Sequence, residues 1–231
     1  MPALLGESMK IELKDIYKKF GKKQVLNGVN LTAESGECIG ILGANGSGKS
    51  TLLSLLAGVL KADKGVFLCD GTDLFKSPKT RSRAVGFVPQ GTPLIEELTA
   101  YDNLFLWYDR ATLKKELNGG MLDMLGINEF LKLRVSKMSG GMKKRLSIGC
   151  AIAGRPPVFL LDEPMSALDI ACKQRIKEYL ESYKNAGGII ILVTHDILEL
   201  SLADRCYILK DGKLTDYEFS GDTEELVKSI I

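Results

Sequence analysis

Uninterrupted runs of apolar residues mark the strands that this chain is expected to bury. Residues 158–161 and 189–193 are apolar throughout, which is typical of parallel strands covered by helices on both faces. Residues 37–42 and 86–88 also read as buried strands, and a further short strand is expected at residues 66–69. These runs predict an α/β fold built on a mostly parallel sheet.

The two ends of the chain add further predicted elements. Residues 10–16 and 25–32 read as two strands joined by a turn at Phe20-Gly21. Near the C-terminus, two strands flank a turn at Asp211-Gly212, and a final helix is expected from about Asp222. Residues 1–8 carry no clear pattern, so an expression remnant, an upstream start and a native disordered tail all remain open.

Between residues 91 and 137 the apolar spacing becomes helical. Tyr101, Leu104, Phe105 and Tyr108 fall on one helix face, and Gly119-Gly120 divides the following stretch into two short helices. We therefore predict a helical lobe inserted into the α/β core. Some of its large apolar residues either form the core of the lobe or lie exposed as a groove for a partner helix: Leu94, Ile95, Leu98, Phe105 and Trp107.

A glycine-rich loop between a predicted strand and a predicted helix gives the clearest indication of chemistry. The pattern G-x-x-x-x-G-K-[ST] is followed by leucines at helical spacing. Its glycines let backbone N–H groups turn toward a polyphosphate, and the helix N-terminus adds partial positive charge. Lys49 would contact the β- and γ-phosphates of the nucleotide, and the Ser50 hydroxyl would ligate Mg²⁺. The loop comprises Gly43, Ala44, Asn45, Gly46, Ser47, Gly48, Lys49, Ser50 and Thr51.

Polar residues that follow other buried strands are candidates for the rest of the reaction. Asp162 would hold Mg²⁺ through a water molecule, and Glu163 could act as the general base on an attacking water. His195, the single histidine, ends another core strand and is a candidate γ-phosphate contact. Gln90 also ends a strand, from which its side chain could reach the metal or the attacking water.

A second potential anion site opens a later helix. Ser139 is a suitable helix N-cap, and Gly140 and Gly141 would leave backbone N–H groups accessible at the helix start. The apolar residues Leu146, Ile148 and Ile152 continue this helix. One triphosphate needs a single cradle, so the phosphate loop by itself does not explain a second one.

Composition narrows the class of protein. With 31 Lys and Arg against 29 Asp and Glu, the chain carries a formal charge of +2, so no broad nucleic-acid surface is expected. The basic run Lys143-Lys144-Arg145 is interpreted as a solvated helix face rather than a binding patch. The five cysteines form no C-x-x-C pair and read as reduced, mostly buried thiols. Without a membrane-length apolar run or a recognisable signal peptide, a cytoplasmic location is expected.

Taken in order, these motifs resemble those of the nucleotide-binding subunits of ATP-binding-cassette (ABC) transporters. The resemblance covers residues 9–231, and Phe20 sits where the family stacks an aromatic ring on adenine. It implies a P-loop NTPase core with a mostly parallel sheet, an N-terminal antiparallel β subdomain and an inserted α-helical subdomain at about 91–155. Residues 43–51 resemble the Walker A motif, Gln90 the Q-loop, 139–142 the signature motif, 158–163 Walker B, 166–169 the D-loop and His195 the switch histidine.

The resemblance also implies cofactors and partners. ATP and Mg²⁺ would bind between the Walker motifs of one subunit and the signature motif, Ser139, Gly140 and Gly141, of another. The two subunits would form an ATP-dependent head-to-tail dimer, identical or not, and the dimer would drive a separate transmembrane permease. The chain would then sit on the inner face of the cell membrane through that permease, with no nucleic-acid partner.

Two residues depart from the family pattern. The common signature is L-S-G-G-Q, whereas this chain has Met138 in place of the leucine and Met142 in place of the glutamine. The serine and glycines that would meet phosphate are kept, so only a side-chain contact at the edge of the nucleotide is in doubt. The form of this motif resembles subunits of bacterial drug and lipid exporters, which favours export. Import, a soluble cassette ATPase acting in DNA repair, translation or metallocluster assembly, and a nucleotide-binding regulator without turnover are the alternatives.

Overall fold

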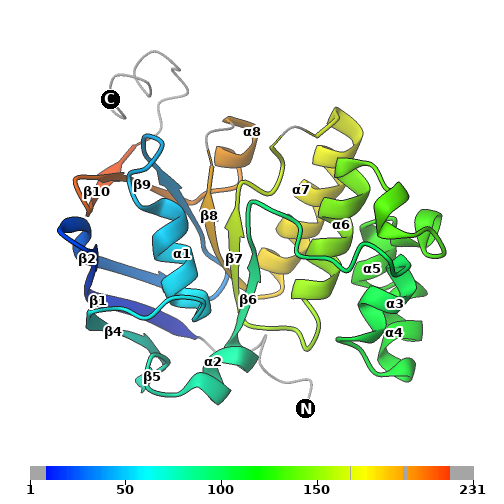
Figure 1. Ribbon diagram of the computed structural model, residues 1–231, viewed down its shortest axis with the longest axis horizontal. Coiled ribbons are helices and arrows are strands. Elements are labelled where there is room, and N and C mark those ends of the chain that lie inside the picture. Colours follow the sequence, from blue (N-terminus) through cyan, green and yellow to red (C-terminus); the bar gives the residue numbers. More distant parts are fainter. Residues whose placement is uncertain (1–8, 167, 195–196, 219–231) are drawn as a thin grey trace.

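The computed structural model describes residues 9–166, 168–194 and 197–218, and its strands form two separate sheets (Figure 1). The antiparallel sheet has the order β2-β1-β4-β5, made of β1 (Lys10–Phe20), β2 (Lys23–Glu34), β4 (Lys64–Cys69) and β5 (Thr72–Asp73). The first two strands are longer than predicted and turn at Gly21-Lys22, because polar residues continue the ladder beyond the buried part, with Lys19 paired to Gln24.

The second sheet is mostly parallel, as predicted, and has the order β10-β9-β3-β8-β7-β6. Its three central strands are buried at every position, which accounts for their unbroken apolar sequences. Only β10 runs antiparallel to its neighbour. The strands are β3 (Cys38–Leu42), β6 (Val85–Val88), β7 (Val158–Asp162), β8 (Ile189–Val193), β9 (Arg205–Lys210) and β10 (Lys213–Tyr217).

Helices fill the two faces of the parallel sheet. Helix α1 (Lys49–Ala57) lies between the two sheets, and the longer helices α6 (Gly140–Ala151) and α7 (Ile170–Asn185) cover the opposite face (Figure 1). Alternate residues of each strand point to alternate faces, so Phe159 joins one core cluster and Leu160 the other. Two short helices complete the core, α2 (Pro78–Ala84) and α8 (Ile197–Leu200).

Helix α1 is shorter than its leucine spacing suggested. It ends at Ala57, because Gly58 adopts a left-handed φ of 83° and donates its N–H to the carbonyl of Leu55. Val59, which lies beyond this end of the helix, is 69 % exposed.

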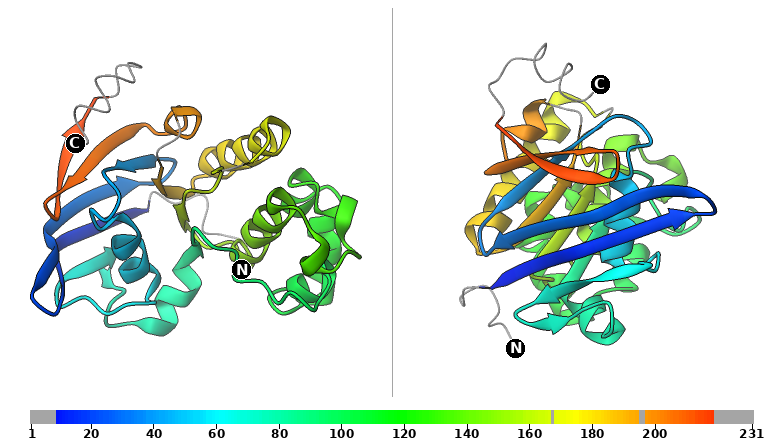
Figure 2. Two further views of the ribbon diagram at one scale, coloured as in Figure 1. Left: turned by 45° about the horizontal axis from the view of Figure 1, so that its top comes forward. Right: turned by 90° about the vertical axis from the view of Figure 1, so that its left-hand side faces the viewer.

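The predicted helical lobe is present at the end of the molecule opposite the antiparallel sheet (Figure 2). Thr99 and Asp102 form a reciprocal capping box at its first helix, and Gly119-Gly120 separates α4 from α5 as expected. Phe105, the last residue of α3, is 48 % exposed, so of the two alternatives left open for it the exposed one applies. Before α6, the lobe comprises α3 (Ala100–Phe105), α4 (Arg110–Leu117), α5 (Met121–Met124) and the 3₁₀ turns η1 (Ile127–Phe130) and η2 (Val135–Lys137).

Several predictions of the sequence fall outside this description. The leader at residues 1–8, the C-terminal helix from about Asp222 and the side chain of His195 lie outside the described residues. Within the part that the structure describes, no helix is both long enough and apolar enough to cross a bilayer. The boundaries 91–155 for a helical subdomain remain a prediction, although α3 to α6 all fall within them.

Candidate functional site

The C-terminal ends of the parallel strands bring most of the predicted site residues to one edge of the sheet. Asp162 pairs with Val193 across β7 and β8, and Ile41 of β3 pairs with the same residue. The phosphate loop, Glu163 and the segment after β8 therefore leave the sheet side by side. Gln90 joins them, because β6 runs beside β7 and ends at Val88.

Glycines shape the phosphate loop in a way that larger residues could not. Gly43 has a φ of 151°, and a Cβ atom there would lie 2.5 Å from the carbonyl oxygen of Leu209. Gly48, at φ 110°, would bring a Cβ to 2.9 Å from Val25. The loop is thus fixed closely against β9 and β2 before any ligand binds. The Ser47 hydroxyl is buried in it without a hydrogen-bond partner in the described structure, which fits an incoming phosphate oxygen.

The side-chain ammonium of Lys49 lies against the backbone of this loop. Its ammonium donates to the carbonyl oxygens of Gly43 at 2.6 Å and Ala44 at 3.0 Å, and the residue is 6 % exposed. Burial lowers the pKa of Lys49, and the negative charges of Glu163 and Asp162 oppose this change. A nearby phosphate would favour the charged form in the same way.

The acidic pair divides into a buried member and a more accessible one. Asp162 is 4 % exposed, and its burial raises the pKa of the carboxyl against the effects of a hydrogen bond from Ser50 and the charge of Lys49. Glu163 is partly exposed and accepts a hydrogen bond from the Gln90 carboxamide, with 3.0 Å between Nε2 and Oε2. Its backbone takes a left-handed φ of 49°, a costly conformation that often occurs at functional sites.

The oxygen ligands at this edge fit a magnesium ion. Ser50 and Asp162 already share a hydrogen bond. Gln90 is hydrogen-bonded to Glu163, the residue that follows Asp162. Hydroxyl, carboxylate and water oxygens are suitable ligands for Mg²⁺, which proteins commonly bind together with substrate phosphates. Among the described residues, no group of three or more His, Cys, Asp or Glu residues is placed to hold a metal.

The second predicted anion site lies apart, on the helical lobe. Ser139 caps α6, since its hydroxyl accepts a hydrogen bond from the Met142 N–H at 3.2 Å. Ser139 and Gly140 are exposed, and Gly141 packs against Cys172 of α7. In the described parts of the chain, no hydrogen bond joins residues 139–141 to the phosphate loop of the same chain.

Phe20, the candidate for adenine stacking, is the last residue of β1 and 48 % exposed. The Lys18 ammonium lies 5.3 Å from the centre of its ring, and Lys18 is held in turn by Asp63 and the Lys61 carbonyl. The ring is thus accessible and one side of it is supported.

The interpretation of Lys143-Lys144-Arg145 as a solvated helix face is wrong for two of the three residues. Lys144 is 5 % exposed and Arg145 8 % exposed. Lys144 donates to the carbonyl oxygens of Pro89 and Gln90, and Arg145 to that of Leu125.

The cysteine prediction is confirmed in part. All five cysteines are free, and Cys38, Cys150 and Cys172 are buried.

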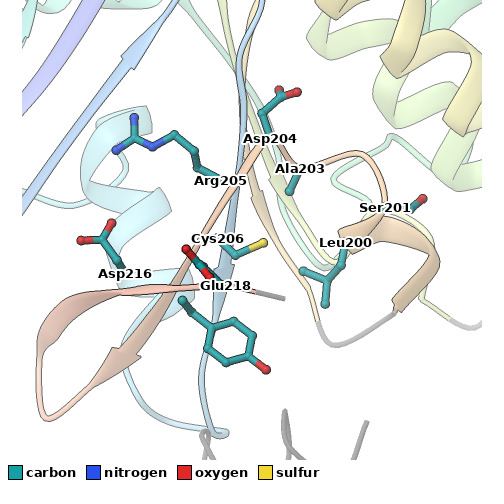
Figure 3. A pocket seen from close by; sticks show the side chains of 9 residues that line it. Leu200, Ser201, Ala203, Asp204, Arg205, Cys206, Asp216 and Glu218 are labelled. Atoms are coloured by element: carbon teal, nitrogen blue, oxygen red, sulfur yellow. The ribbon is translucent and has the colours of Figure 1, made fainter. Parts of the chain in front are cut away.

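A cavity of about 870 Å³ lies between α8, β9 and β10, and Cys206 is one of the residues that line it (Figure 3). None of the predicted site residues lines this cavity.

Comparisons with known proteins agree with this geometry. The family described as ABC transporter matches residues 26–166, which is more than half of the chain. The chain is 34 % identical to the probable sulfate/thiosulfate import ATP-binding protein CysA of Chlorella vulgaris, covering 94 % of this chain and 93 % of that one. It is 35 % identical to the Nod factor export ATP-binding protein I of Rhizobium sp. (strain N33), covering 88 % and 68 %.

A solved structure gives the same answer. The dimeric post-hydrolysis state of the ATP-binding cassette MJ0796, bound to ADP and Pi, matches with a TM-score of 0.80 and 30 % identity, covering 92 % of this chain and all of that one. The two sheets and the inserted lobe of this chain therefore match the fold of a solved ATP-binding cassette. This chain belongs to the ABC transporter family and is one of its ATP-binding domains.

Proposed function

We propose that this chain is an ATP-hydrolysing subunit that powers export through a separate transmembrane partner. The observation that carries the proposal is the convergence of a lysine-filled phosphate loop, Asp162 and a hydrogen-bonded Gln90–Glu163 pair at one sheet edge. The loop and Lys49 would bind the phosphates of a nucleoside triphosphate, Asp162 would hold its metal ion, and Glu163 with Gln90 would act on the attacking water.

Binding begins with a change of partners for Lys49. Its ammonium leaves the carbonyl oxygens of Gly43 and Ala44 and moves to the β- and γ-phosphates. The N–H groups at the start of α1 and the Ser47 hydroxyl complete the cradle. Phe20 provides a surface for the adenine ring. Ser50, Gln90 and, through a water molecule, Asp162 would hold Mg²⁺, which would supply positive charge to neutralise the phosphate oxygens.

In the hydrolysis step, Glu163 would act as the general base. The oxygen of a water molecule bonds to the γ-phosphorus, the bond from that phosphorus to the oxygen of the leaving ADP breaks, and the Glu163 carboxylate accepts the water's proton. The Gln90 carboxamide holds the carboxylate at Oε2 from the side of β6. His195 would contact the γ-phosphate from the segment after β8.

A second subunit would supply further backbone N–H groups to the γ-phosphate. Ser139 and Gly140 are exposed at the start of α6, which leaves the N–H groups of that helix accessible to a phosphate on another copy. A head-to-tail dimer would join these groups to the γ-phosphate. The dimeric MJ0796 cassettes support this arrangement.

A membrane partner fits the exposed apolar residues of the helical lobe. Leu94 and Leu98 are half-buried, whereas Ile95, Phe105 and Trp107 are exposed by 45 %, 48 % and 64 %. Exposure of three of these five residues favours the groove over the alternative in which all five form the lobe's own core. We infer that they receive a helix of the permease, which would hold this chain at the inner face of the membrane.

The direction of transport rests on a smaller observation. The form of the motif at residues 138–142 resembles that of exporters, and the Nod factor relative supports export. The similar CysA relative is an importer subunit, so import is the second candidate.

ATP turnover tests the proposal. Glu163→Gln keeps the side-chain shape and an oxygen that can still accept from Gln90, but the new amide cannot take up a proton. The turnover rate should fall ~10²–10⁴-fold while MgATP binding is preserved. Wild-type protein that binds ATP without hydrolysing it, or a variant that retains the wild-type rate, would contradict the assignment.

A further inference from the structure

Lys144 of the signature helix is buried and faces into its own subunit. It lies on α6 five positions after Ser139 and is 5 % exposed. Its ammonium donates to the carbonyl oxygens of Pro89 at 3.2 Å and Gln90 at 3.1 Å. A buried ammonium is costly unless it is hydrogen-bonded, so these two contacts fix where the helix meets the segment after β6.

The contacted segment leads directly to the proposed general base. The carbonyl of Gln90 accepts from Lys144, and the carboxamide of the same residue donates to Glu163 Oε2 at 3.0 Å. Two consecutive hydrogen bonds therefore connect the helix that carries Ser139 with the carboxylate. Pro89 has no N–H, so its carbonyl is the only hydrogen-bonding group of its main chain.

The charges around Lys144 support this arrangement. Burial lowers the pKa of Lys144, whereas the negative charges of Asp162, Glu199 and Glu163 raise it. Glu199 is itself buried and accepts the N–H of Met165, two residues after Glu163. The ammonium thus lies in the field of the acidic pair rather than in solvent.

We propose that Lys144 is a positioning residue for Glu163, which acts by fixing the Gln90 backbone from the signature helix. The inference rests on the proposed ATPase function. It means that a displacement of α6, such as one caused by a nucleotide held on a second subunit, changes the placement of Gln90 and so of the general base. Ser139 and Glu163 are then coupled within one chain.

Matched variants on one helix test the proposal. Lys144→Met removes the charge and the donors but keeps much of the volume. Lys143→Met removes the same charge one position earlier, where the ammonium pairs with Glu96 at 2.9 Å on the partly exposed side. Lys144→Arg keeps the charge and the hydrogen-bond donors, so it should retain most of the turnover that Lys144→Met loses.

The turnover numbers should separate positioning from folding. We expect Lys144→Met to lower kcat about tenfold with KM within about threefold of wild type, and Lys143→Met to change neither. In a Gln90→Ala background, Lys144→Met should lower kcat less than about twofold, because the carboxamide that connects this segment to Glu163 is gone. An equal loss in both backgrounds, or an equal loss in Lys143→Met, would overturn the proposal.

Hydrogen exchange gives a second readout that needs no turnover. Lys144→Met should speed exchange of the amides at residues 90–92 in the nucleotide-free protein and leave residues 43–51 unchanged. Unchanged exchange at 90–92 would show that Lys144 does not fix this segment. If wild-type protein hydrolyses no ATP, the proposed function fails while this exchange result still reports on the contact itself.

Discussion

Replacing Lys49 with alanine should separate ATP binding from folding. In the nucleotide-free protein the Lys49 ammonium already has two carbonyl partners, at 2.6 and 3.0 Å. Moving it to phosphate therefore exchanges one set of hydrogen bonds for another, and the net gain is about that of one charge-assisted hydrogen bond, ~1.5–3 kcal/mol. At 1.4 kcal/mol for each factor of ten, Lys49→Ala should weaken MgATP binding roughly 10–150-fold.

The effect on hydrolysis should exceed the effect on binding. Charge on the γ-phosphate oxygens is redistributed in the transition state, and Lys49 is placed to stabilise it, so turnover should fall below detection. Folding should change by no more than about 2 kcal/mol, because the lost hydrogen bonds are offset by removal of a buried cation.

Calorimetric titration with MgATP, beside thermal unfolding, provides the assay. Lys76→Ala is a matched control, because it also removes one lysine charge, but from a side chain that is 81 % exposed. A dissociation constant for Lys49→Ala within about threefold of wild type, with unfolding unchanged, would refute the assignment of the phosphate loop.

Two further predictions concern the glycine loop and the thiols. Gly43→Ala should destabilise the fold by more than ~3 kcal/mol, because a Cβ would lie 2.5 Å from a backbone oxygen, whereas Gly46→Ala, with open space around it, should cost ~1 kcal/mol; equal unfolding temperatures would contradict this. Native protein at pH 8 should react with a thiol reagent mainly at the half-buried Cys69 and Cys206, because burial raises the pKa of Cys38 and Cys150 to about 12 and removes the reactive thiolate. Rapid reaction of all five thiols before unfolding would contradict the buried placement.

The sequence was most informative where a backbone pattern fixes both structure and chemistry. Gly43 and Gly48 occupy conformations and close contacts that only glycine tolerates, so the loop can be recognised from residue types alone. The placement of Asp162 and Glu163 followed from one rule, that parallel strands end at a common edge. Their exposure, and the hydrogen bond between Gln90 and Glu163, required the structure.

Long-range contacts explain what the sequence did not predict. Lys144 and Arg145 look like solvated residues by composition, yet their partners lie in segments 54 and 20 positions away. Phe105 shares the helical spacing of the buried Leu104 and Tyr108, but α3 ends at Phe105. Local periodicity cannot foresee either case, because the first depends on packing between distant elements and the second on where a helix stops.

The central claim is that ATP held by the phosphate loop of one subunit is closed upon by the signature helix of another and is cleaved with Glu163 as base. Sedimentation of Glu163→Gln with ATP and with ADP tests it most directly, because this variant should keep ATP intact long enough to stabilise the closed state. The account predicts monomers without nucleotide and with ADP, and dimers with ATP that disappear when Ser139→Arg is added. A dimer that forms equally with ADP, or that survives Ser139→Arg, would contradict it.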